Sequence, residues 1–188
     1  MARIIECVPN CSEGRNKEVI EYIADAVRKV PGVALMDYSS DENHNRSVFT
    51  IVGDPDQMAE AAFQFAKACV EKIDMTKHQG EHPRMGAVDV IPFTPVKDVP
   101  MEECIELSKK VAKRIWEELG MPVTLYEESA TAPHRRNLAA IRKGQFEAMP
   151  EKLKDPQWYP DYGNHEIHPT AGIVAVGARF PLVAFNIN

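Results

Sequence analysis

The densest group of reactive side chains in this sequence lies in one short stretch near its middle. The stretch holds two imidazoles, a carboxylate and a guanidinium, and it reads His78-Gln79-Gly80-Glu81-His82-Pro83-Arg84-Met85-Gly86. An imidazole with an ordinary pKa of about 6.5 is suited to accepting and releasing protons at neutral pH. The glycines and the proline predict a loop, and catalytic side chains are often carried on loops. A solvent-exposed loop with surface histidines is the alternative that these residues leave open.

The same stretch contains the pattern His-x-x-Glu-His, from His78 to His82, which occurs in one class of zinc proteases. Zinc binding through such a pattern requires both histidines on one face of a helix. Gly80 inside the pattern and Pro83 directly after it disfavour a continuous helix. No third ligand is evident nearby in the sequence, so we predict no metal site.

A second polar stretch covers residues 37–46 and reads Asp-Tyr-Ser-Ser-Asp-Glu-Asn-His-Asn-Arg. It offers the carboxylates of Asp37 and Asp41, the amide of Asn45 and the guanidinium of Arg46. Such a segment could position a polar ligand. The alternative is a turn stabilised by hydrogen bonds from short polar side chains to the backbone.

A third polar stretch, residues 9–16, lies where a strand is expected to turn into a helix. Free N–H groups at a helix start can bind a carboxylate or a phosphate, and plain helix capping is the alternative. The sequence has neither a P-loop lysine nor a G-x-G-x-x-G pattern, so it does not predict nucleotide binding. It also has no G-x-S-x-G pattern to support a Ser-His-Asp hydrolase.

Apolar periodicity predicts the elements that position these stretches. Strands are expected at residues 3–9, 33–36, 47–52, 88–93, 123–126, 173–176 and 182–187. Helices are expected at residues 16–29, 54–73 and 100–119, with one or two short ones within 134–149. Residues 39–45, 75–86 and 150–170 are expected to be loops. This pattern predicts an α/β (α+β) fold in which helices pack on a mixed β-sheet.

Composition sets the class of protein. The chain has 188 residues, 27% charged and 44% hydrophobic, which is typical of one globular domain. Its formal net charge of −6 disfavours non-specific nucleic-acid binding. No apolar run approaches the ~20 residues of a membrane span, and the first residues do not resemble a signal peptide. We therefore expect a cytoplasmic protein without disulfides and without a membrane partner.

Together these stretches resemble glutamate formiminotransferase, the transferase part of formiminotransferase-cyclodeaminase. The resemblance runs along essentially the whole chain in the expected order. The residues that carry it are Val8-Pro9-Asn10, Ser12-Glu13-Gly14-Arg15-Asn16, Asn45-Arg46, Gly80-Glu81-His82-Pro83-Arg84-Met85-Gly86-Ala87, Pro160-Asp161-Tyr162-Gly163 and Phe185-Asn186-Ile187-Asn188.

The resemblance implies two subdomains, each a mixed sheet with helices packed mainly on one face. Tetrahydrofolate would lie in a positively lined tunnel between them. As a co-substrate it would receive, on N5, the formimino group of N-formimino-L-glutamate. The reaction belongs to histidine degradation and one-carbon metabolism, and the implied partners are these small molecules, without a metal.

The resemblance also implies roles for individual residues. His82 would be the general base. Asp37, Asp41 and Glu81 are the acids expected near the cationic amidine, and Ser39 stands where animal members carry an acid. Arg15, Arg46 and Arg84 are expected to bind the carboxylates of glutamate and of the folate tail. Asn45 belongs to the matched pair Asn45-Arg46. The remaining segment is expected to contact folate and consists of Asp161, Tyr162, Gly163, Asn164, His165, Glu166, Ile167, His168, Pro169 and Thr170.

The resemblance further divides the chain. Residues 1–179 correspond to the N-terminal subdomain, and residues 180–188 to the start of the junction into a C-terminal subdomain that this chain lacks. We therefore expect a C-terminal subdomain or a second chain as partner, and a homo-oligomer is left open. A non-catalytic half-protein that binds folate or a partner is the alternative function.

Overall fold

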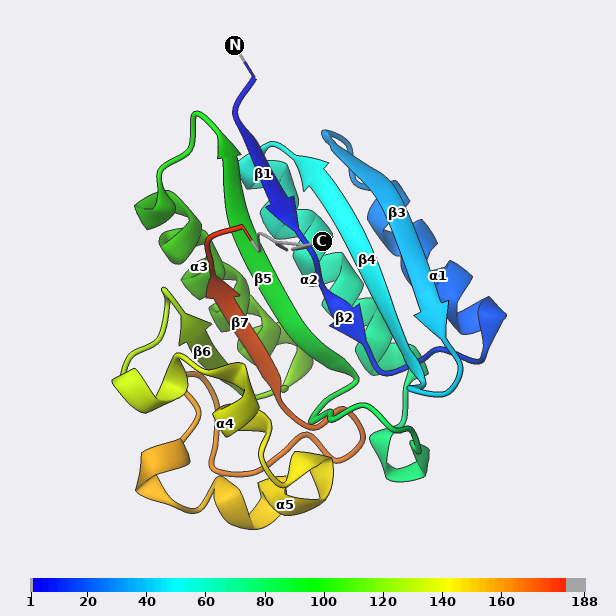
Figure 1. Ribbon diagram of the computed structural model, residues 1–188, viewed down its shortest axis with the longest axis vertical. Coiled ribbons are helices and arrows are strands. Elements are labelled where there is room, and N and C mark those ends of the chain that lie inside the picture. Colours follow the sequence, from blue (N-terminus) through cyan, green and yellow to red (C-terminus); the bar gives the residue numbers. More distant parts are fainter. Residues whose placement is uncertain (1, 182–188) are drawn as a thin grey trace, which may run out of the picture.

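The computed structural model describes residues 2–181, which form a mixed sheet with helices layered on it (Figure 1). Within this range the sheet has 7 strands, β1 (Ile4–Cys7), β2 (Asn10–Cys11), β3 (Val33–Asp41), β4 (Arg46–Gly53), β5 (Val88–Lys97), β6 (Val123–Glu127) and β7 (Val174–Ala178). Their order across the sheet is β3, β4, then β1 and β2 together, then β5, β7 and β6. β7 is parallel to β5 and β6, and the other pairs are antiparallel. The predicted mixed α/β (α+β) fold is confirmed.

Three long helices cover one face of the sheet and lie behind it in Figure 1. They are α1 (Lys17–Arg28), α2 (Pro55–Lys72) and α3 (Met101–Leu119). The Asn16 side chain accepts hydrogen bonds from the first turn of α1, and Asp54 does the same for α2. Gly120, in the left-handed conformation with φ 67°, ends α3. The predicted positions of these helices are confirmed to within a residue or two.

The opposite face of the sheet is covered at one end by two short helices, α4 (Leu138–Arg142) and α5 (Gln145–Lys152). In Figure 1 they lie at the lower end of the sheet, with α4 beside the lower part of β7 and α5 below it. A second, smaller apolar core forms beneath them and contains Met85, Val90, Tyr126, Ile141, Met149, Leu153, Ile173 and Ala175. No helix of the described chain covers the upper part of this face in Figure 1, and Glu6 of β1 and Thr50 of β4 are partly exposed there.

The structure corrects three boundaries. The loop predicted at residues 39–45 is wrong for 39–41, because β3 continues to Asp41 and pairs with β4 throughout. β3 is an edge strand that is largely exposed, so it lacks the apolar alternation that reveals a strand in a sequence. β2 lies within a predicted turn, and β5 runs on to Lys97.

The strand predicted at residues 182–187 lies outside the described residues. A search of the described helices finds none with the length and apolarity needed to cross a membrane.

Candidate active site

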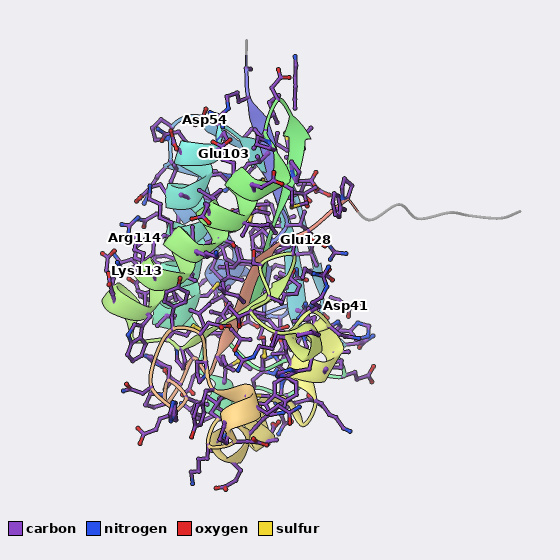
Figure 2. All side chains as sticks on the ribbon, turned by 90° about the vertical axis from the view of Figure 1, so that its left-hand side faces the viewer. Asp41, Asp54, Glu103, Lys113, Arg114 and Glu128 are labelled. Carbon is purple, nitrogen blue, oxygen red and sulfur yellow. The ribbon has the colours of Figure 1, made fainter. Side chains whose placement is uncertain are left out.

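A groove of about 790 Å³ lies on the sheet face opposite α1, α2 and α3. It is lined by Glu6, Val8, Asn10, Ser39, Ser40, Asp41, His44, Arg46, Val48, His82, Val90, Pro92, Thr94, Tyr126, Leu138, Arg142, Arg179 and Pro181. Successive residues of a strand point to opposite faces, so Ile5 and Cys7 enter the core while Glu6 reaches the groove. Figure 2 shows Asp41 on the opposite side of the molecule from Lys113 and Arg114 of α3.

The geometry of His82 fixes which of its nitrogens can act as a base. Its Nδ1 lies 2.6 Å from the carbonyl oxygen of Pro83, and a carbonyl oxygen only accepts hydrogen bonds. Nδ1 therefore carries the proton, and the Nε2 lone pair is left for another group. Burial lowers the pKa of His82, and the nearby Arg46 guanidinium lowers it further. His82 is therefore a neutral imidazole at pH 7.

The side chain of Asn45 connects the His82 loop to the rest of the molecule. Its Oδ1 accepts a hydrogen bond of 2.8 Å from the N–H of Gly14, and its Nδ2 donates one of 3.1 Å to the carbonyl of Gln79. Asn45 is buried and has a left-handed backbone with φ 51°, a conformation that asparagine tolerates better than most residues. The structure thus gives Asn45 a positioning role, outside the groove lining.

The His82 loop also lies directly against the turn between β3 and β4. The N–H of Glu81 donates a hydrogen bond of 3.2 Å to the carbonyl of Asn43. A Cβ atom at Gly80 would overlap the backbone carbonyl of His44, so only glycine allows this close approach. Glu81 itself is exposed and does not line the groove.

Arg84 is oriented away from the groove. Its Nε donates to Nδ1 of His78 at 2.9 Å, and its two terminal nitrogens bind the Glu147 carboxylate at 2.9 and 2.6 Å. Nε2 of His78 in turn donates to the carbonyl of Asn45 at 3.0 Å, so His78 is held neutral with both nitrogens engaged. The Arg84 side chain is only 7% exposed. Its hydrogen bonds therefore fix the loop to α5.

A buried carboxylate holds two arginines at the base of the groove. Asp89 is 0% exposed, and its Oδ2 lies 3.1 Å from Arg46 Nη1 and 2.8 Å from Arg142 Nη2. Its Oδ1 accepts a hydrogen bond of 2.7 Å from the N–H of Met85, at the end of the His82 loop. Asn10 accepts a further bond from Arg46 Nε at 3.1 Å. Of the arginines predicted to bind carboxylates, Arg46 is the one that lines the groove beside His82.

Asp41 and His44 are hydrogen-bonded at the rim, with 2.8 Å between Oδ2 and Nδ1. The His44 ring meets the His82 ring edge to face, with centroids 6.0 Å apart. Hydrogen bonds from His44, first its backbone N–H and then its ring, lower the pKa of Asp41. The structure thus brings the predicted acid Asp41 and the predicted base His82 into one groove.

Two other predicted residues lie elsewhere. Asp37 is exposed on edge strand β3, opposite Thr50 of β4, and does not line the groove. Arg15 is exposed and donates through Nε to the carbonyl of Glu42 at 2.8 Å. The structure does not bring either of them to His82.

The segment from Asp161 to Thr170 lies at the lower edge of the molecule, in orange in Figure 1, and does not line the groove. Asp161 accepts bonds from the N–H of Leu125 and from Thr131, at 2.7 and 2.6 Å. Further contacts also hold the segment in place. Tyr162 pairs with Val123, and the His165 ring stacks on Tyr159. Ile167 packs on the smaller core, and His168 accepts hydrogen bonds from the N–H groups of Thr170 and Ala171. Folate contact by this segment stays a prediction.

Among the residues that the sequence prediction omitted are Tyr126, Arg142 and Arg179, which line the groove, and Asp89, which binds Arg142. One signal was available, because Asp89 stands between Val88 and Val90 in an apolar strand, and a buried carboxylate needs a cationic partner. Across residues 2–181, no group of three His, Cys, Asp or Glu side chains could hold a metal ion.

Comparisons with known proteins give a consistent result. The family model described as formiminotransferase domain, N-terminal subdomain, matches residues 4–179. A glutamate formimidoyltransferase of Streptococcus pyogenes serotype M1 is 63% identical over 188 residues, which is 100% of this chain and 63% of that protein. A glutamate formimidoyltransferase of Thermoplasma acidophilum is 48% identical over 98% of this chain and 61% of its own length. The formimidoyltransferase-cyclodeaminase of Mus musculus is 50% identical, and the chain covers 35% of it.

Proposed function

Because the chain belongs to the family of formiminotransferase N-terminal subdomains, we propose that it forms one half of a folate-dependent transferase. The reaction moves a formimino group from N-formimino-L-glutamate to N5 of tetrahydrofolate, as a step of histidine degradation. Residues 1–179 supply the N-terminal subdomain, and tetrahydrofolate is a co-substrate. The similarity to glutamate formimidoyltransferases along the whole chain supports this assignment.

One observation carries the chemical part of the proposal. His82 presents a neutral imidazole whose Nδ1 proton is held by Pro83, in the same groove as Arg46 and Asp41. N5 of tetrahydrofolate loses its proton as it bonds to the amidine carbon, and Nε2 of His82 accepts that proton. When the tetrahedral intermediate breaks down, the bond from carbon to the glutamate nitrogen is cleaved. The imidazolium returns the proton to that nitrogen, which restores His82.

The charged side chains around His82 suit both the binding of the donor and the transfer of the proton. The amidine of the donor is cationic at neutral pH, and the Asp41 carboxylate at the rim favours it there. Arg46 acts on the base and not on the donor. Its charge helps to keep the His82 pKa low and so keeps the base unprotonated. Holding both substrates in one groove supplies much of the acceleration through proximity.

The proposal includes a second surface. The chain spans less than two thirds of the length of the curated relatives described above. Exclusion of water from a groove on a sheet face requires another surface over it. We expect that surface to be a C-terminal subdomain or a second chain, and a homo-oligomer would serve the same end.

The test measures turnover of N-formimino-L-glutamate with tetrahydrofolate. The chain is assayed alone and joined to the C-terminal part of the Streptococcus pyogenes relative. We expect turnover in the joined form and a loss of about a hundredfold or more in His82→Asn, with an unchanged thermal unfolding curve. Equal rates for His82→Asn and the unaltered protein would remove the base assignment. Tetrahydrofolate binding without turnover in the joined form would favour the alternative, a non-catalytic binding protein.

A further inference from the structure

Three buried polar atoms in the described residues make no hydrogen bond of good geometry, and all three belong to residues that line the groove. They are Oη of Tyr126, Nε of Arg142 and Nε of Arg179, and the Arg179 side chain lies beside the Tyr126 hydroxyl. Tyr126 is only 1% exposed. A buried donor without a partner costs stability, and native proteins leave few of them, so a cluster in one groove needs an explanation.

The three side chains come from separate elements, and all of them line the groove. Tyr126 lies on β6, Arg142 ends α4, and Arg179 follows β7 directly. β6 and β7 are neighbouring strands, and the N–H of Arg179 is fixed by a hydrogen bond of 2.9 Å to the carbonyl of Phe93. Asp89 holds Arg142 at 2.8 Å, so its guanidinium is oriented before any ligand arrives. The site is therefore built from ordered parts of the fold.

The charges of the groove residues are unbalanced. Arg46 and Arg142 share the single carboxylate of Asp89, and within the described residues Arg179 has no carboxylate at ion-pair distance. The groove's other acids are Glu6 and Asp41, and Asp41 is engaged by His44. Burial raises the pKa of the Tyr126 hydroxyl, which therefore stays protonated and acts as a donor. An anionic hydrogen-bond acceptor is the kind of ligand that suits this set of donors.

We propose that Tyr126, Arg142 and Arg179 form a carboxylate-binding subsite in the same groove as His82. The planar guanidinium fork matches a carboxylate, and the tyrosine hydroxyl can donate to one of its oxygens. The source of the carboxylate rests on the proposed function, because both the amino-acid donor and the glutamyl tail of tetrahydrofolate present this group. The subsite anchors one of them and so orients it toward His82.

The test measures binding by calorimetry and needs no group transfer. The probes are L-glutamate, tetrahydrofolate and tetrahydropteroate, which lacks the glutamyl tail, and each is titrated into the chain joined to the C-terminal part of the Streptococcus pyogenes relative. The variants are Arg179→Gln and Tyr126→Phe, because Arg142 also stabilises buried Asp89 and its loss could unfold the protein. Arg136→Gln is the matched control, since Arg136 is an exposed arginine paired with Glu128 outside the groove.

We expect Arg179→Gln to weaken binding about tenfold or more and Tyr126→Phe about fivefold, while Arg136→Gln binds normally. Weaker binding of L-glutamate assigns the subsite to the donor. Weaker binding of tetrahydrofolate, with tetrahydropteroate unchanged, assigns it to the folate tail. Unchanged affinity of both variants for L-glutamate and tetrahydrofolate would overturn the subsite, as would a failure of the unaltered protein to bind either.

These outcomes are separate from the fate of the proposed function. If His82→Asn abolishes turnover and neither subsite variant alters binding, the transferase proposal stands and the subsite is wrong. If carboxylate binding depends on Arg179 but no formimino transfer is found, the subsite stands and the transferase proposal is wrong.

Discussion

Nε of Arg84 donates a hydrogen bond to Nδ1 of His78 at 2.9 Å, so an arginine expected to bind substrate fixes a histidine of its own loop. The same guanidinium binds both oxygens of Glu147 on α5. The sequence could not reveal this, because Glu147 lies about sixty residues further along the chain. Because Arg84 bonds to both His78 and Glu147, we expect a substitution of Arg84 to change the stability of the fold.

We predict that Arg84→Lys lowers the free energy of unfolding by about 1–3 kcal/mol, because an ammonium cannot reproduce the planar fork in a buried site. Urea denaturation measures the effect. Arg15→Lys is the control, since Arg15 is exposed and makes one side-chain bond to a carbonyl, and it should cost less than about 0.5 kcal/mol. Unchanged stability in Arg84→Lys, with a raised KM for the donor, would show that Arg84 binds substrate after all.

The protonation of His82 gives a second prediction. Burial and the charge of Arg46 lower its pKa, so turnover should fall as the pH drops through a value below about 6.5. Arg46→Gln removes a positive charge, which makes the imidazolium less unfavourable and should raise the His82 pKa. NMR titration of the His82 imidazole measures this pKa in the variant and in the unaltered protein. Arg46→Lys keeps the charge and should titrate as the unaltered protein does, and a lower pKa in Arg46→Gln would contradict the argument.

His78 predicts how stability depends on pH. Burial lowers its pKa in the folded protein, while the unfolded chain keeps the ordinary value of about 6.5. Neutral His78 therefore stabilises the fold fully above that ordinary value, and this contribution is lost as the pH falls through the lowered pKa. Thermal unfolding followed between pH 7 and pH 5 should show a falling Tm, and His78→Gln should flatten the fall.

Two other histidines, His82 and His168, also have pKa values lowered by burial. His168→Gln therefore serves as the comparison for His78→Gln. The His78 assignment requires that its variant flatten the curve by an amount that the His168 variant does not reproduce. Identical curves for the unaltered protein and His78→Gln would exclude it.

Substitutions of Gly80 and Gly120 distinguish two reasons why a glycine is required: close contact with a neighbouring atom and a left-handed backbone. Gly80→Ala should cost about 1–3 kcal/mol, because the added Cβ overlaps the His44 carbonyl and pushes the His82 loop away. Gly120→Ala meets no neighbouring atom and should cost about 1 kcal/mol, through its left-handed φ alone. Turnover should fall in Gly80→Ala and persist in Gly120→Ala. Equal turnover in both would mean that this contact does not position His82.

The elements with strong local signals were predictable from the sequence, and the groove was not. Helices α1, α2 and α3 have clear apolar periodicity and capping residues, so their bounds agree with the structure. The start of β3 was predicted at residues 33–36, but its continuation to Asp41 was not, because an exposed edge strand shows no apolar alternation. His82, Asp41 and Arg46, which were predicted to be site residues, line one groove in the structure. Tyr126, Arg142 and Arg179 lie in local sequence without a functional pattern, and only tertiary packing brings them to the same groove.

The carboxylate of Asp89 joins Arg46, at the start of β4, to Arg142, at the end of α4. These arginines come from opposite halves of the chain, so an incompletely folded molecule has no groove to offer. A ligand that uses both therefore binds the native state alone and shifts the folding equilibrium toward it by mass action. Substrate supply would in that case protect the protein from unfolding.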